Sequence, residues 1–100
     1  MPIIELPEPI AFEWDKGNQA KSFVKHRITN EESEEVLLSF EHIIFEDLAH
    51  SGIEKRYVAI GLSRNTKMLT VIFTIRKNKI RIVSARPASR KERRIYEKTS

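Results

Sequence analysis

Three apolar segments rich in β-branched residues, separated by very short links, constrain the fold of this chain most. They are RYVAIGLS at residues 56–63, MLTVIFTIR at residues 68–76 and KIRIVSA at residues 79–85. Segments of this composition and length are typical of strands. The links of four and two residues are too short for a crossover helix, and Asn78 tolerates the positive φ of a tight hairpin. We therefore predict an antiparallel meander, preceded by a shorter strand at 43–45.

The sequence before residue 43 favours helices after an extended start. The three prolines within residues 1–9 predict an extended lead-in, and the apolar alternation over 10–14 predicts a short strand. Asp15 is a suitable N-cap for a helix over about 16–26. The expected buried stripe of that helix is Ala20, Phe23 and Val24.

Two capping boxes mark two further helices. Thr29 with Glu32 predicts a helix to about residue 40, whose buried side would consist of Val36, Leu37 and Phe40. Ser89 with Glu92 predicts a last helix through about residue 98, which has almost no apolar face. Two N-terminal helices, an antiparallel meander and a C-terminal helix together define an α+β domain.

Length and composition limit the class of protein. One hundred residues suffice for one domain, so we expect 1–100 to be a single unit. The absence of cysteine fits a reducing compartment. The first five residues lack the basic region of a secretory signal, and no run approaches the roughly 20 apolar residues of a membrane span. We therefore expect a cytoplasmic protein with no membrane partner.

Charge is divided unevenly along the chain. Residues 1–50 hold four Lys or Arg against eleven Asp or Glu, whereas residues 51–100 hold fourteen against three. This asymmetry favours one surface for a polyanion and another for a different partner. The alternative is that the two sets of charges are solvated faces that meet across the fold.

Motifs for metals and cofactors are missing. The sequence has no glycine-rich phosphate loop, no HExxH and no Cys/His cluster, and its three histidines, His26, His42 and His50, are scattered. We therefore expect no metal and no cofactor. Any catalysis would depend on positioned side chains alone.

Arginines concentrate in the last two strands and the last helix. A guanidinium matches a phosphate bidentately, so several of them at strand ends could converge on one. A ribonuclease also needs a base for the 2′-hydroxyl and an acid for the departing 5′-oxygen. The alternative is that individual arginines pair with the acidic first half. The set comprises Arg76, Arg81, Arg86, Arg90, Arg93 and Arg94.

Three other positions have both a structural and a functional interpretation. His26 at a helix end either stabilises the helix dipole or acts as an acid or base. Glu54, beside Arg56 at a strand start, is either a base or half of an exposed ion pair. Trp14 is interpreted as a core residue rather than a platform for base stacking.

A series of motifs resembles the BrnT family of toxins. The motifs follow the family's order over residues 12–97, and the closing segment that matches ISARxAxxxE, at residues 83–92, is the most specific of them. The motifs are FEWD at 12–15, KH at 25–26, FED at 45–47, HS at 50–51, EKRYVAIG at 54–61, RIVSARPASRKERR at 81–94 and YE at 96–97.

The resemblance implies a RelE/ParE-like fold and a metal-independent ribonuclease that arrests growth. It also implies a BrnA-type antitoxin, usually a ribbon-helix-helix DNA-binding protein, through which operator DNA would be bound. The candidate catalytic residues are His26, Glu54, Arg76, Arg81 and Arg86, and the candidate RNA-binding residues are Lys25, Arg56 and Arg64.

One position departs from the family pattern. Arg27 stands where the family usually has glycine after the histidine. A residue other than glycine is destabilised by about 1 kcal/mol in the left-handed conformation. We therefore expect the helix to end differently and His26 to be displaced.

Two other functions fit the same residues. The chain could be a catalytically inactive module that binds RNA or a partner, or a ParE-like toxin aimed at a protein target such as gyrase. For the antitoxin we expect a site on the poorly covered last helix, with the acidic second helix as the alternative. The antitoxin-binding candidates are Arg90, Arg93, Arg94, Ile95 and Tyr96.

Overall fold

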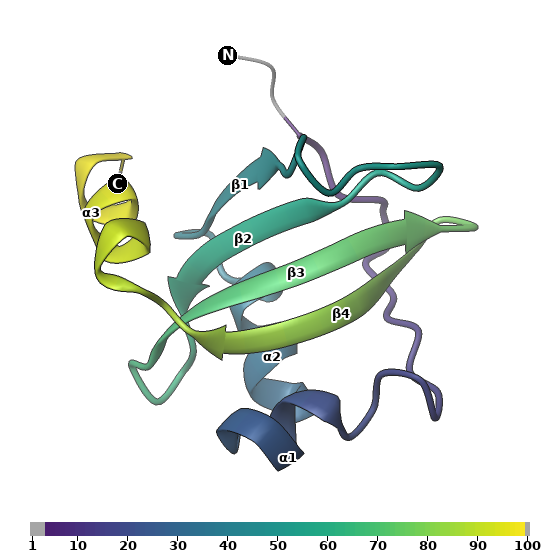
Figure 1. The fold of residues 1–100 in the computed structure, drawn as a ribbon, viewed down its shortest axis with the longest axis horizontal. Helices are drawn as coiled ribbons and strands as arrows, with labels where there is room; N and C mark the ends of the chain where they lie inside the picture. Colours follow the sequence, from purple (N-terminus) through teal and green to yellow (C-terminus); the bar gives the residue numbers. More distant parts are fainter. Residues whose placement is uncertain (1–3, 100) are drawn as a thin grey trace.

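A computed structural model describes residues 4–99 and confirms the α+β class (Figure 1). The predicted meander is a four-stranded antiparallel sheet in the order β1-β2-β3-β4. In Figure 1, α2 lies behind the sheet, α1 lies below β4, and α3 lies at the left end of the sheet, so much of the front face has no covering helix. The elements are α1 (Lys21–His26), α2 (Asn30–Leu38), β1 (Ile43–Glu46), β2 (Tyr57–Leu62), β3 (Met68–Arg76), β4 (Lys79–Pro87) and α3 (Arg90–Thr99).

The β3–β4 hairpin forms as its link predicts. Lys77 and Asn78 both have positive φ, at 48° and 65°, which suits a two-residue turn. Arg76 pairs with Lys79 beside that turn, and Leu69 pairs with Pro87 at the far end. The lead-in at residues 4–9 has no regular structure, and residues 1–3 of the predicted lead-in lie outside the described residues.

The main core lies between the sheet and the helices α1 and α2. Val36 and Leu37 of α2 are buried, as predicted, against alternate residues of the strands. The capping box of Thr29 and Glu32 is confirmed in both directions. The buried strand residues on this face are Ala59, Leu69, Val71, Phe73, Ile80, Ile82 and Ala85.

The first helix is shorter than predicted and faces the other way. It begins at Lys21, because the Asp15 side chain accepts a hydrogen bond from the Gly17 N–H and pairs with Arg81 instead of capping a helix. Phe23 and Val24 are 45% and 77% exposed, and Ala20 is also exposed, so the predicted apolar stripe was wrong. The helix instead buries Ser22, whose hydroxyl accepts a hydrogen bond from the N–H of Ala85 in β4.

Two smaller expectations also need correction. Residues 10–14 form a single parallel bridge between Phe12 and Ile80 rather than a strand, although Phe12 and Trp14 pack against the core. Helix α2 ends at Leu38, because Ser39 returns to an extended conformation. Phe40 therefore lies beyond the helix and is fully exposed.

Arg27 takes the place of glycine without changing how α1 ends. Its φ and ψ of 59° and 28° are left-handed, and its N–H donates to the Phe23 carbonyl at 2.8 Å. The bond from Arg27 to Phe23 is the one that a left-handed glycine cap makes, and the Ile28 N–H also reaches the Ser22 carbonyl at 3.4 Å. The guanidinium of Arg27 lies 5.5 Å from the centre of the Phe23 ring. The expectation that the helix would end differently was wrong.

The last helix covers one end of the opposite sheet face. Its box of Ser89 and Glu92 is confirmed, but Tyr96 is the buried residue on it. Tyr96 packs with Val58 and Ile60, and its hydroxyl donates to the carbonyl of Glu41. Helix α3 is thus held through few apolar residues, as its composition predicts.

Replacing Arg27 should reveal the energy stored in its left-handed backbone. Arg27→Gly and Arg27→Ala both remove the guanidinium above Phe23, but only glycine relieves the steric conflict of the Cβ atom. We expect the glycine variant to have a free energy of unfolding about 1 kcal/mol above that of the alanine variant. Urea denaturation of the two proteins measures this difference, and equal midpoints would contradict it.

Candidate functional site

A bulge in β4 brings the strand arginines to one face of the sheet. Ile72 pairs with Ser84 and Phe73 with Ile82, so Val83 is an extra residue in β4. Arg81 and Arg86 are five positions apart, and in a regular strand they would point to opposite faces. The extra residue changes this, and they pair with Thr74 and Thr70, which lie on the face opposite α1 and α2. We call this face the open face.

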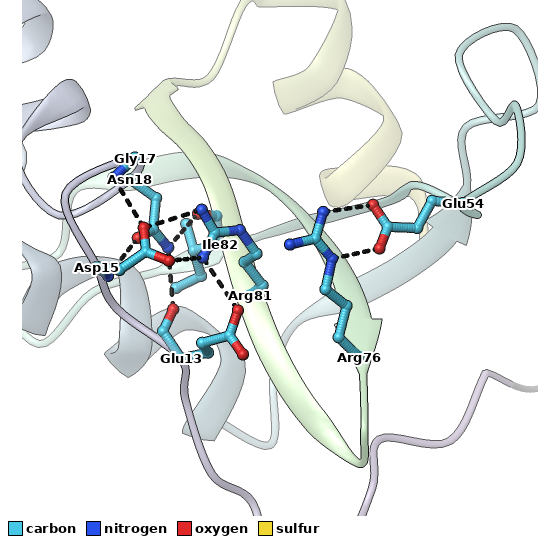
Figure 2. Close-up of polar contacts among 8 residues, drawn as sticks. All are labelled: Glu13, Asp15, Gly17, Asn18, Glu54, Arg76, Arg81 and Ile82. Atoms are coloured by element: carbon cyan, nitrogen blue, oxygen red, sulfur yellow. Dashed lines mark hydrogen bonds and ion pairs between the residues drawn. The ribbon is translucent and has the colours of Figure 1, made fainter.

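Acidic residues of the first half hold Arg81. Its Nη1 lies 3.0 Å from Glu13 Oε1 and 2.8 Å from Asp15 Oδ2, and its Nη2 lies 3.0 Å from Asp15 Oδ1 (Figure 2). The hydrogen bond from Arg81 lowers the pKa of Asp15, and Asp15 in turn raises the pKa of Arg81. The buried Asn18 fixes this loop on β4, because its amide donates to the carbonyls of Glu13 and Ile82.

Arg76 and Glu54 form a second, bidentate pair. Nη2 of Arg76 donates to Glu54 Oε1 at 2.9 Å, and Nε donates to the other carboxylate oxygen (Figure 2). The hydrogen bond from Arg76 lowers the pKa of Glu54, so this carboxylate stays ionised. Both predicted site residues are thus brought together in an ion pair, but Glu54 pairs with Arg76 rather than beside Arg56, and the partner of Arg76 does not come from the acidic first half.

The two pairs border a hollow of about 180 Å³ on the open face. We call it the Arg81 hollow. Its lining includes Lys21, Glu54, Arg56, Thr74, Arg76 and Arg81. Four of these six side chains are cationic and one is anionic, so the hollow favours a negatively charged ligand.

A second hollow of about 330 Å³ adjoins the same face. We call it the His50 hollow. Arg56 lines both hollows and lies between them. The lining of the second includes Asp47, His50, Arg56, Val58, Arg86 and Glu92. Among residues 4–99, Arg56 is not in an ion pair.

The β1–β2 connection positions the histidine of this hollow. The Asp47 N–H donates to the Arg56 carbonyl at 2.8 Å, and the Arg56 N–H donates to Ser51 Oγ at 3.0 Å, which closes the loop. Within it, His50 Nδ1 lies 2.8 Å from Asp47 Oδ2. An imidazole oriented by a carboxylate through one nitrogen has its other nitrogen available to exchange a proton.

Arg86 is fixed by the last helix. Its Nη1 and Nη2 donate to the two oxygens of Glu92 at 2.7 and 2.8 Å, and this carboxylate raises the pKa of Arg86. Burial by itself would raise the pKa of Glu92, but hydrogen bonds from Arg86, from the Ser89 N–H and from Thr70 lower it to about 2. The pair thus joins β4, β3 and α3 at the edge of the His50 hollow.

The other predicted site residues lie elsewhere. His26, at the end of α1, is half-buried and lines neither hollow, and Lys25 beside it is exposed. Arg64 lies in the β2–β3 turn, where its N–H donates to Glu35. The candidates for antitoxin binding on α3 differ in exposure. Tyr96 is buried and Ile95 is half-buried, whereas the arginines at positions 90, 93 and 94 are exposed.

The sequence reasoning missed His50, Asp47, Lys21 and Thr74 as site residues. An Asp three residues before a His is a weak signal, and only the closed β1–β2 loop shows that the two side chains meet. Among residues 4–99, no three His, Asp or Glu side chains gather as they would around a metal ion. No helix in the same range is long and apolar enough to cross a bilayer.

The fold and the open face define a small α+β domain with a cationic face that carries an imidazole. The chain matches the family described as the ribonuclease toxin BrnT of type II toxin–antitoxin systems over residues 14–92. Because this match covers most of the sequence, the chain belongs to the BrnT toxin family. A search of curated proteins found no match.

Removing the charge of Glu92 should weaken the fold and change its response to acid. Because the folded pKa of about 2 lies below the ordinary value of 4.5, the ionised group stabilises the fold above pH 4.5. This contribution is lost as the pH falls from 4.5 to 2. We expect Glu92→Gln to lower the free energy of unfolding at pH 7 by about 2 kcal/mol.

The measurement is urea denaturation of both proteins between pH 2 and pH 7. The difference between them should shrink towards pH 2. The matched control is Glu97→Gln on the exposed side of the same helix, which should unfold like the original protein. A difference that stays constant with pH would show that the ion pair is not its cause.

Proposed function

We propose that this toxin cleaves RNA in the His50 hollow. The observation that carries the proposal is the hydrogen-bonded pair of Asp47 and His50 in one hollow with Arg56 and Arg86. An oriented imidazole beside two guanidiniums provides a proton acceptor and positive charge for a phosphodiester. RNA is the substrate because its own 2′-hydroxyl can act as the nucleophile.

His50 acts as the general base. Its Nδ1–H donates to Asp47, which leaves Nε2 to take the proton of the 2′-hydroxyl. The 2′-oxygen attacks the adjacent phosphorus, and the bond from phosphorus to the 5′-oxygen breaks. The departing 5′-oxygen takes a proton from solvent. The products are a 2′,3′-cyclic phosphate and a 5′-hydroxyl.

Arg56 and Arg86 stabilise the charge that develops on the phosphoryl oxygens. The bidentate pair with Glu92 fixes the guanidinium of Arg86, so it does not have to be ordered when the substrate arrives. Arg56 has no carboxylate partner among the described residues and is half-buried between the two hollows. A phosphate bound there would give the Arg56 guanidinium an anionic hydrogen-bond acceptor.

The proton acceptor is assigned to His50 rather than to the two candidates from the sequence. Glu54 is paired with Arg76, and its lowered pKa makes it a weaker base. His26 lies on α1, outside both hollows. The same assignment needs no metal ion, so we propose that cleavage is metal-independent.

The remaining features of the proposal follow from the family. We propose a RelE/ParE-like architecture, growth arrest in the cytoplasm through loss of RNA, and neutralisation by a BrnA-like antitoxin of the ribbon-helix-helix class. Membership of a type II toxin–antitoxin family supports a protein antitoxin. Helix α3 is the proposed docking element, because it exposes Arg90, Arg93 and Arg94 and is held to the sheet mainly through Tyr96.

Substitutions in the His50 hollow should reduce RNA cleavage without unfolding the protein. We expect His50→Gln to lower the cleavage rate by about 100-fold or more, which is the usual contribution of a general base. Arg86→Ala should lower it by at least about tenfold, since it removes a cation beside the reacting phosphate. Arg81→Ala, in the adjoining Arg81 hollow, should also lower it by at least about tenfold, since it removes a cation from the face that holds the RNA strand. Gel analysis of a labelled RNA measures the rates, and far-UV circular dichroism checks the fold.

The matched variant is His26→Gln, which removes the other candidate imidazole. If cleavage is lost in His26→Gln and kept in His50→Gln, the general base is His26 and not His50. The same assay in excess EDTA should show undiminished cleavage. Loss in EDTA with recovery on adding Mg²⁺ would refute the metal-independent mechanism.

Antitoxin binding should protect helix α3 from hydrogen exchange. Acidic antitoxin side chains that oppose the exposed arginines would order this weakly held helix. We expect residues 89–98 to exchange more slowly in the complex, as measured by mass spectrometry of the toxin with and without antitoxin. Protection that falls on α2 instead would place the antitoxin on the acidic helix.

A further inference from the structure

Thr74 has a buried hydroxyl with no hydrogen-bond partner. The residue is 2% exposed, and its Oγ1 makes no hydrogen bond. Thr74 lines the Arg81 hollow and pairs across the strands with Arg81. A buried hydroxyl without a partner destabilises the fold, so its presence here needs an explanation. Thr70, four residues earlier on the same face, is satisfied by Glu92.

The cations around this hydroxyl retain unused donors. Arg81 binds its carboxylates through Nη1 and Nη2 only, and Arg76 binds Glu54 through Nε and Nη2. Figure 2 shows the remaining nitrogen of Arg76 on the side that faces Arg81. Lys21 and Arg56 complete the rim and, among residues 4–99, are not in ion pairs. A hydroxyl and several N–H groups around one hollow are what a phosphate oxygen requires.

The rim is also closely packed around Arg81. A Cβ atom at Gly17 would lie 3.0 Å from Arg81 Nη2 and 3.1 Å from Asp15 Oδ1. A side chain at this position would therefore require the Arg81 guanidinium or the Asp15 carboxylate to shift by a few tenths of an ångström. Glycine allows the close approach of these two groups to the backbone.

The Arg81 hollow adjoins the His50 hollow through Arg56. Thr70 is opposite Arg86 and Thr74 is opposite Arg81, so the two arginines are about 13 Å apart along β3. A single RNA strand of a few nucleotides can reach both. We propose that the Arg81 hollow is a subsite for a second phosphodiester group of the same RNA strand, with Thr74 as its hydroxyl ligand. This inference rests on the proposed cleavage at the His50 hollow.

The test is binding of an oligonucleotide that cannot be cleaved. A 2′-deoxy tetranucleotide lacks the attacking hydroxyl, so its affinity is measurable by fluorescence anisotropy whether or not the protein is an enzyme. We expect Thr74→Val, which keeps the shape of the side chain, to weaken binding about fivefold to tenfold. The free energy of unfolding of this variant should be equal to or above that of the original, because a buried hydroxyl without a partner is removed.

A double-mutant cycle that combines a change in the protein with a change in the oligonucleotide shows which phosphodiester Thr74 contacts. Each phosphodiester in turn is replaced by an uncharged methylphosphonate, and affinities are measured for the original protein and for Thr74→Val. Replacing one particular linkage should weaken binding about fivefold in the original protein and have almost no effect on binding in the variant. The matched control is Thr99→Val on α3, which should show the same linkage pattern as the original.

The outcomes separate this subsite from the proposed function. Unchanged affinity of Thr74→Val, or additive effects at every linkage, would overturn the subsite even if RNA is cleaved. Weaker antitoxin binding with unchanged oligonucleotide binding would also overturn it, because the hollow would then hold a carboxylate of the partner. Competition by inorganic phosphate without coupling at any linkage would show a free-anion site and overturn it as well. A coupled linkage in a protein that cleaves no RNA would support the subsite and refute the proposed function.

Discussion

The extra residue at Val83 is the constraint on which the open face depends. Before the bulge, Ile80 and Ile82 are buried and Arg81 faces outward, whereas after it Ala85 is buried and Arg86 faces outward. Both halves of β4 thus bury their apolar residues in one core, and both arginines lie on the opposite face. In a regular strand Arg81 and Arg86 would lie on opposite faces, and so would Ile82 and Ala85, so such a strand could neither complete the core nor bring the arginines together. The register change therefore places Arg81 at one hollow and the Arg86–Glu92 ion pair, which links β4 to α3, at the other.

Local signals in the sequence predicted the parts of the fold that local interactions determine. The β-branched segments, the turn at Asn78 and both capping boxes depend on residues a few positions apart, and all of them formed. The errors arose where a side chain that could have made a local interaction binds a residue far away in the sequence instead. Asp15 could have capped a helix, but Arg81, 66 positions away, binds its carboxylate instead. Ser22 rather than Phe23 faces the sheet, because the edge strand offers the Ala85 N–H as a donor.

For the candidate site, the sequence indicated the type of side chain but not the arrangement of the side chains. The excess of arginine in the last strands indicated phosphate binding, but neither the bulge that aligns the arginines nor the carboxylate at each guanidinium has a local signal. His50 was the larger omission. Its proximity to Asp47 depends on a loop that a backbone bond between Asp47 and Arg56 closes, and that bond forms only once β1 and β2 are paired.

One of the two explanations offered for the uneven charge, that the acidic and basic halves meet across the fold, holds in part. Glu13 and Asp15 from the acidic half do pair with Arg81, as solvated faces that meet across the fold would. These carboxylates engage one edge of the guanidinium and fix its plane, while the cationic excess of the hollow remains. A carboxylate has the same bidentate geometry as a phosphate, so the pairs hold each arginine in an orientation suited to an anion. Around the Arg81 hollow, Lys21 and Arg56, which are in no ion pair among residues 4–99, and the partnerless Thr74 hydroxyl are then the groups with hydrogen-bonding capacity left for an anion. Glu13 and Asp15 of the acidic half therefore orient Arg81 on the open face and leave the cationic excess of the hollow in place.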